Sequence, residues 1–126
     1  MKTFSAKLQR GSMLLESLIS VLIFSIALLG LGSLAAQALN QSGQSKARND
    51  ASNLASELIG DMWISSSTPA TYDTTAWQAR VAANLPGGTA TVTPSGTQIA
   101  IVINWTDPKN QGVSHVYSTT AQIAKN

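Results

Sequence analysis

The sequence contains no cysteine, which excludes a disulfide framework and any cysteine-based metal site. His115 is the only histidine, and no cluster of carboxylates accompanies it, so a metal site is not expected. The serine-rich residues 65–67 have no neighbouring base in the sequence that could activate a nucleophile. Neither an enzyme activity nor a cofactor is therefore predicted.

The chain also lacks a basic surface suited to nucleic acid, although its net charge is +2. Residues 1–11 hold Lys2, Lys7 and Arg10 and no acidic residue. The remaining residues carry five basic and six acidic side chains, a formal net charge of −1. The positive charge thus belongs to the N-terminal leader, where it is typical of a cytoplasmic anchor next to a membrane span, and no nucleic acid partner is expected.

A long apolar run extends from Ser17 past Ala36, and Glu16 lies at its edge, five residues after Gly11. A run of about 18 apolar residues can cross a bilayer as a helix. A carboxylate in such a span costs roughly 2.5–3.5 kcal/mol on insertion scales, so Glu16 is a candidate functional residue. The alternative is a glutamate that reaches the lipid headgroups. Gly30 and Gly32 are expected to make the helix flexible or to let another helix approach.

The leader differs from a secretory signal peptide. Its apolar stretch is longer than the usual ~7–15 residues, and no small-residue cleavage site follows it. The small residue, Gly11, precedes the apolar run instead. We interpret residues 1–11 as a leader that is cut on the cytoplasmic side while the hydrophobic segment is retained.

The rest of the helix has a different pattern. Apolar residues from Ala51 to Met62 recur at helical spacing and form one face of an amphipathic helix. No proline interrupts the preceding residues, so we expect one helix from about Ser12 to Ile64. Its amphipathic half is expected to pack under a sheet formed by the head.

The C-terminal part predicts a short helix and three strands. Trp77, Val81 and Leu85 recur at helical spacing, and Asp73 or Thr74 could cap that helix. Residues 89–93, 98–106 and 113–123 alternate as strands, with a turn expected at residues 94–96. Alternation places Ile99, Ile101, Ile103 and Trp105 on one face of the second strand. Trp77 and Trp105 are both expected in the core, with a surface that faces a partner as the alternative. The predicted fold class is α+β, with an antiparallel meander packed on the helix. The predicted segments are a leader (1–11), a transmembrane and assembly helix (12–39) and a periplasmic head (40–126).

The N-terminal pattern resembles that of type IV prepilins. It consists of a basic leader, Gly11, the residues Ser-Met-Leu-Leu-Glu ending at Glu16, and an apolar run. More of the chain is similar to minor pilins of the PilV type. This similarity rests on residues 28–31 (LLGL), 51–58 (ASNLASEL), 77, 85–88 (LPGG) and 103–107 (INWTD).

The resemblance implies a pilin-like fold and a minor pilin of the bacterial inner membrane, a single-pass protein with its head in the periplasm. It would be cut between Gly11 and Ser12 by a prepilin peptidase. Ser12, where the family usually has phenylalanine, would be the N-methylation position, and Glu16 would pair with a neighbour's N-terminal amine. The implied partners are other minor pilins, the major pilin, the inner-membrane assembly platform and membrane lipid. The implied role is to prime or cap a type IV pilus (fimbrium), including at its tip, in a system associated with cell adhesion.

Two departures from the family and three other functions remain. Major pilins have a proline within the span, where this chain has Gly30 and Gly32. Many pilins close a C-terminal loop with a disulfide, which this chain cannot form.

The nearest alternative is a pseudopilin of type II secretion. Another is an uncleaved, signal-anchored periplasmic binding domain. A membrane-tethered enzyme is the least favoured because the sequence offers no catalytic constellation.

Overall fold

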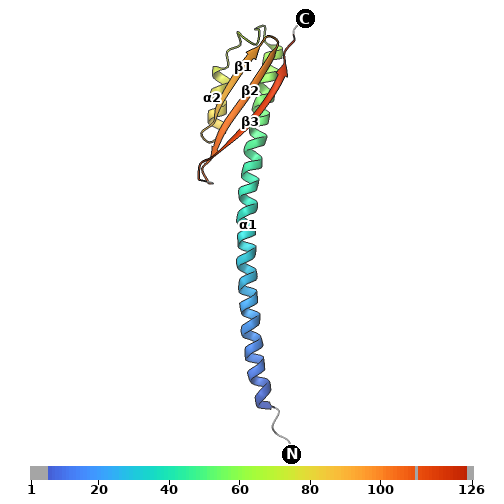
Figure 1. Ribbon diagram of the computed structural model, residues 1–126, viewed down its shortest axis with the longest axis vertical. Coiled ribbons are helices and arrows are strands. Elements are labelled where there is room, and N and C mark those ends of the chain that lie inside the picture. The colour runs from blue at the N-terminus through green and yellow to red at the C-terminus, as the bar shows by residue number, and fades with distance from the viewer. Residues whose placement is uncertain (1–5, 110, 125–126) are drawn as a thin grey trace, which may run out of the picture. The chain divides into compact units, whose positions relative to one another are not determined.

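The computed structural model of the protein describes residues 6–109 and 111–124. The elements follow one another as α1 (Ala6–Ile64), α2 (Thr75–Asn84), β1 (Thr89–Ser95), β2 (Gln98–Asp107) and β3 (Val113–Gln122) (Figure 1). The chain divides into two compact units, Met1–Asn40 and Gln41–Asn126. A long N-terminal apolar helix and a small antiparallel sheet confirm the α+β class.

Helix α1 ends at Ile64, as expected, but it begins at Ala6 and not at Ser12. The expected N-terminal boundary was therefore wrong by six residues. Residues 6–10 are Ala, Lys, Leu, Gln and Arg, all of which have high helix propensity. Gly11 alone is too weak a breaker to stop a helix that good helix formers continue on both sides.

The three strands form one sheet in the order β1-β2-β3, which confirms the meander. β2 and β3 pair over ten consecutive positions, from Gln98↔Gln122 to Asp107↔Val113. β1 pairs with the other edge of β2 over seven positions. Because side chains alternate between the faces of a strand, this register fixes which residues face the helices.

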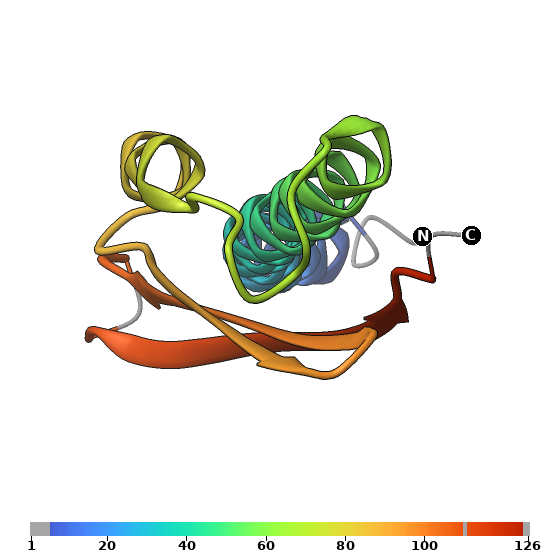
Figure 2. The same cartoon turned by 90° about the horizontal axis from the view of Figure 1, so that it is seen from above.

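One face of the sheet packs against helices, and no helix of the described residues covers the other (Figure 2). Figure 2 shows α2 and the second part of α1 on the same side of the three strands. Among the described residues, every fully buried residue between these layers is apolar. The core contains Leu54, Leu58 and Met62 from α1, Trp77 and Val81 from α2, and Ile99, Ile101, Ile103 and Trp105 from β2. The predicted contact between the alternating β2 residues and the amphipathic half of α1 is confirmed, as are the core positions of both tryptophans.

The turn between β1 and β2 lies two residues later than expected. β1 continues through Pro94 to Ser95, and Gly96 and Thr97 form the turn. Gly96 has a positive φ of 62°, as the first central residue of a type II′ hairpin turn requires. Pro94 is compatible with the strand because β1 is an edge strand, where a missing N–H does not break the ladder.

The link from α2 to β1 is closely packed. Gly87 has a φ of 58°, which favours glycine. A Cβ atom at Gly88 would lie 2.6 Å from the carbonyl oxygen of Val81. The Pro86 carbonyl oxygen accepts a 2.9 Å hydrogen bond from the backbone N–H of Thr106, which ties the link to β2. Both glycines are therefore required by the backbone path.

The start of α2 is held by Asp73. Its Oδ1 accepts a 2.9 Å hydrogen bond from the backbone N–H of Thr75, while Thr74 makes no side-chain capping bond. Hydrogen bonds from the Thr75 hydroxyl and then from its backbone N–H hold the pKa of the Asp73 carboxyl below its usual value. Of the two predicted capping residues, Asp73 is the one that satisfies a free N–H of the first turn.

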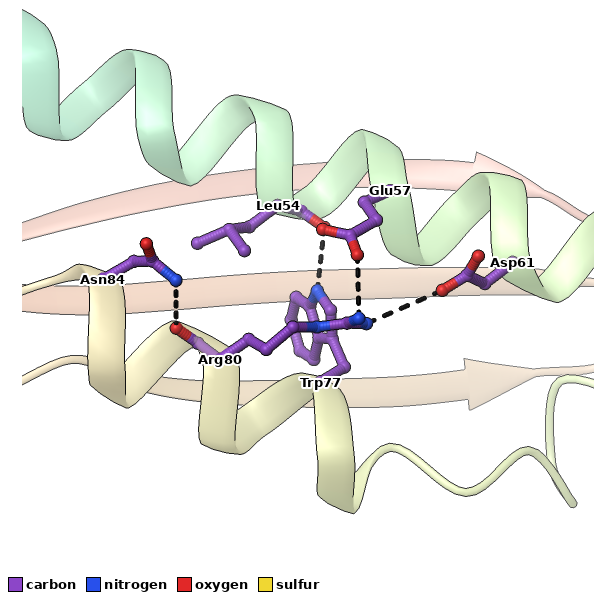
Figure 3. Close-up of polar contacts among 6 residues, drawn as sticks. All are labelled: Leu54, Glu57, Asp61, Trp77, Arg80 and Asn84. Carbon is purple, nitrogen blue, oxygen red and sulfur yellow. Dashed lines mark hydrogen bonds and ion pairs between the residues drawn. The ribbon is translucent and has the colours of Figure 1, made fainter.

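Polar contacts also join α2 to α1 (Figure 3). The Trp77 indole Nε1–H donates a 2.8 Å hydrogen bond to the Leu54 carbonyl oxygen. Arg80 reaches two carboxylates, with Nη1 3.0 Å from Oε1 of Glu57 and Nη2 3.6 Å from Oδ2 of Asp61. The three charged side chains are each more than 40% exposed, so solvent screening makes these ion pairs weak. The indole contact is the one that is buried.

Candidate functional site

The predicted site lies in the part of α1 that belongs to the unit Met1–Asn40. Every side chain from Gly11 to Asn40 is exposed within the isolated chain. Fifteen of them are large and apolar: Met13, Leu14, Leu15, Leu18, Ile19, Val21, Leu22, Ile23, Phe24, Ile26, Leu28, Leu29, Leu31, Leu34 and Leu39. An apolar surface of this extent requires a lipid or protein environment.

The length and composition of α1 suit a membrane span. No charged residue occurs between Glu16 and Lys46. Within Gly11–Ile64 the helix is long and apolar enough to cross a bilayer. Its backbone hydrogen bonds are made within the helix, which is what a hydrocarbon environment demands of a spanning segment.

Glu16 is the single charged residue between Gly11 and Ser45. Its carboxylate makes no ion pair or hydrogen bond with any residue that the structure describes. It shares one helix face with Met13, Ser17, Ser20 and Val21, which together line a shallow hollow on α1. The Ser17 hydroxyl is not available to Glu16 in this arrangement, because it donates to the Met13 carbonyl oxygen at 2.9 Å. The carboxylate is thus left for a group outside the described chain.

Gly11 and Ser12 lie inside the first turns of α1, not at its beginning. Apart from its chain neighbours and the adjoining turns of helix backbone, no described atom lies within 4 Å of the Cβ that a side chain at Gly11 would add. The fold of the chain itself therefore does not require glycine at this position. The same holds for the other glycines of α1, Gly30, Gly32, Gly43 and Gly60, so open space does not by itself single out Gly11.

Gly30 and Gly32, the predicted flexible positions, lie within continuous helix. Neither has a positive φ, so both adopt backbone conformations that other residues also allow. Their flexibility remains a prediction. In a water-exposed helix each would cost about 1 kcal/mol relative to alanine.

His115 is half-buried, and its ring makes a contact that the sequence did not suggest. Its ring stacks on Trp105 of the neighbouring strand, with ring centroids 5.7 Å apart and planes inclined by 22°. The two residues lie ten positions apart, and only the β2–β3 register brings them together. Alternation predicted the helix-facing side for Trp105, but one sequence does not show which strands pair.

Among residues 6–109 and 111–124 the structure contains no group of three or more histidine or acidic side chains that could hold a metal ion. Comparisons with protein-family models, with curated proteins and with solved structures find no match to this chain. The function is therefore inferred from the residues themselves.

Proposed function

We propose that the chain is a minor pilin of the PilV type, a subunit that helps to prime or cap a type IV pilus. The observation that carries this proposal is the position of Glu16. It is the only charged residue from Gly11 to Ser45, it has no partner among the described residues, and it follows Gly11 by five residues. A plain membrane anchor has no need of a carboxylate at this position, because the carboxylate opposes insertion.

Cleavage after Gly11 supplies the missing partner. It leaves a new amine on Ser12, four residues before Glu16. That step is about 6 Å along a helix and returns to nearly the same face. The Glu16 carboxylate of an incoming subunit would pair with the amine of a neighbour. In a low-dielectric environment both charges must be matched, so this pairing would fix the axial position of one subunit against the next.

The retained helix has two tasks in this proposal. Its first part anchors the subunit in the bacterial inner membrane and later contacts other pilins, while its second part completes the core of a periplasmic head. The expected partners are the prepilin peptidase, other minor pilins, the major pilin and the inner-membrane assembly platform. Membrane lipid surrounds the span before assembly.

Mass spectrometry of the mature N-terminus tests the proposal. The chain is purified from membranes of cells that contain a prepilin peptidase, and from matched cells without it. We expect a chain that begins at Ser12, with or without one methyl group, only when the peptidase is present. If residues 1–11 are retained in both kinds of cell, the uncleaved, signal-anchored binding domain is favoured instead.

A variant at the cut site adds a control. Gly11→Val introduces a branched side chain where the peptidase must accommodate the backbone, so we expect a retained leader with membrane insertion unchanged. Gly43→Val places the same side chain at another open helical glycine and should be processed normally.

Co-purification distinguishes a pilus subunit from a pseudopilin of type II secretion. Recovery of the chain with secretion-system pseudopilins instead of pilins would indicate type II secretion.

A further inference from the structure

A polar hollow of about 210 Å³ lies within the unit Gln41–Asn126, between α1 and the β2–β3 strand pair. It is lined by Gln41, Gln44, Ser45, Arg48, Trp105 and His115. A single water molecule needs only about 10–15 Å³ by a comparable measure, so the hollow can admit a larger group. None of these lining residues is acidic.

The α1 wall of the hollow is rich in hydrogen-bond donors. Gln41, Gln44, Ser45 and Arg48 follow one another at spacings of three, one and three residues, which places them on one helix face. None of the four side chains makes a hydrogen bond or ion pair with a residue that the structure describes. Lys46, between them in sequence, instead pairs with Asp50 at 3.0 Å. Two amides, a hydroxyl and a guanidinium therefore face the hollow without partners in the described chain.

The opposite wall is aromatic. Trp105 and His115 occupy paired positions on β2 and β3, and their rings stack. Nε2 of His115 is buried and has no hydrogen-bond partner among the described residues. Buried polar atoms without partners are uncommon in folded proteins, and each calls for a specific explanation. His115 also lines the hollow, so a ligand held there would lie against this ring.

We infer that this hollow binds a carboxylate, presented by an acidic side chain of another polypeptide. The Arg48 guanidinium can hold both oxygens of a carboxylate in a bidentate arrangement. The neighbouring amides and hydroxyl donate further hydrogen bonds. The half-buried His115 ring, backed by the buried Trp105 ring, offers an apolar surface for the methylene groups of a glutamate.

A phosphate group fits these residues less well. The hollow has one positive side chain, Arg48, which matches a carboxylate of charge −1 better than a phosphate monoester of charge −1.5 to −2. Phosphate sites also commonly use free backbone N–H groups at helix N-termini. Here the residues lie in the interior of α1, where backbone N–H groups are already bonded within the helix.

This site lies in the head and does not involve Gly11, Ser12 or Glu16, so it stands whether or not the chain is a pilin. It can be tested on the full-length protein in zwitterionic detergent micelles. The probe is N-acetylglutamate α-amide, whose only charge is its side-chain carboxylate, and N-acetylglutamine α-amide is the matched neutral probe. Binding is followed by ¹H–¹⁵N NMR through the Trp105 indole, the Arg48 Nε–H and the His115 ring signals.

We expect saturable shifts at Trp105, Arg48 and His115 with the glutamate probe at millimolar concentration, and no saturation with the glutamine probe. Arg48→Gln should weaken binding about tenfold, because it removes a charged hydrogen-bond donor. Lys46→Gln removes a charge from the same stretch of helix and should leave binding within a factor of two. The Trp77 indole signal, which comes from the core, reports whether each variant is folded.

Three results would overturn the inference. The first is equal binding of the glutamine and glutamate probes. The second is an Arg48→Gln variant that is folded and binds the glutamate probe as well as the unaltered chain does. The third is tighter binding of dimethyl phosphate than of the glutamate probe, which would indicate a phosphodiester ligand such as a lipid headgroup.

Discussion

The indole nitrogen of Trp77 donates a buried 2.8 Å hydrogen bond to the backbone carbonyl of Leu54, 23 residues earlier in the chain. This contact fixes the position of α2 on α1 at the centre of the head. Trp77 also fills the core there with an exposed fraction of 1%. One side chain thus provides both a large apolar volume and the specific polar contact between the two helices.

Trp77→Phe should lower the free energy of unfolding by roughly 1–3 kcal/mol, through the lost hydrogen bond and the volume left unfilled. The measurement is urea unfolding of a head fragment that begins at Gln41. Trp63→Phe is the control, because Trp63 is 48% exposed, and it should change stability by less than about 0.5 kcal/mol. Equal effects of the two substitutions would contradict this role for Trp77.

The register of β2 can be tested at two adjacent residues. Ile101 is fully buried against the helices, whereas Val102 lies on the other face and is half-buried. Ile101→Ala should destabilise the head fragment by roughly 2–5 kcal/mol. Val102→Ala should cost less than about 1 kcal/mol in the same unfolding experiment. The reverse order would mean that the strand faces the helices with its other side.

Two glycines should respond to alanine with opposite signs. At Gly88 a Cβ atom would lie 2.6 Å from the Val81 carbonyl oxygen and 2.9 Å from the Leu85 Cβ, so Gly88→Ala should destabilise by about 1–3 kcal/mol. At Gly60 the Cβ meets open space within helix α1, and Gly60→Ala should stabilise by about 0.5–1 kcal/mol. Thermal unfolding of the two variants compares them directly. If Gly88→Ala leaves the stability unchanged, the link after α2 can rearrange to accept the Cβ atom.

The capping contact at Asp73 predicts a pH effect. Because the folded-state pKa of Asp73 lies below the ordinary value of 3.8, its contribution to stability is present above that pH and is lost as the pH falls through the lower folded value. Thr75→Ala removes the hydroxyl that contributes most to the lowered pKa and keeps the backbone N–H. The pKa of Asp73, measured from its carboxyl carbon by NMR, should therefore rise toward 3.8 without reaching it. An unchanged value would assign the effect to the backbone bond alone.

The assembly hypothesis predicts a specific defect for Glu16→Ala. Insertion and leader cleavage should remain, because the variant removes a carboxylate that opposes insertion. Association with other minor pilins should be lost, as measured by co-purification from membranes. Ser17→Ala is the control on the same helix face, since its hydroxyl only bonds back to Met13 within the helix. If Glu16→Ala recovers its partners undiminished and the cells are normally piliated, the hypothesis of a pair between chains is wrong. The carboxylate would then pair only with the amine of its own chain or interact with the headgroups.

Local periodicity was sufficient to predict most of the fold. Apolar spacing located the amphipathic half of α1, and alternation located β2 and the face that carries Ile99, Ile101 and Ile103. The errors occurred at boundaries. Proline suggested a turn at Pro94, but an edge strand accommodates proline. The predicted leader boundary suggested a helix start at Ser12, but the helix-forming residues before it extend α1 to Ala6.

The candidate site could be predicted only where it is contiguous in sequence. Gly11 and Glu16 are five residues apart, and their spacing is visible without a structure. The hollow at Arg48 and His115 joins residues 67 positions apart, and it depends on the pairing of β2 with β3 and on the face of α1 that meets them. No local pattern in the sequence shows which strands pair or which face of α1 meets them.

The outer edge of β3 has a practical consequence for experiments on the isolated head. Its ten residues pair with β2 without a bulge, and they include no lysine, arginine, acidic residue or proline. Among the described residues no strand covers its outer edge. Natural proteins commonly protect such edges with charge, proline or a bulge, because unprotected edges template pairing between chains. A concentrated head fragment should therefore tend to self-associate along β3, and a lysine substituted at the exposed Ser118 is a rational way to keep it monodisperse.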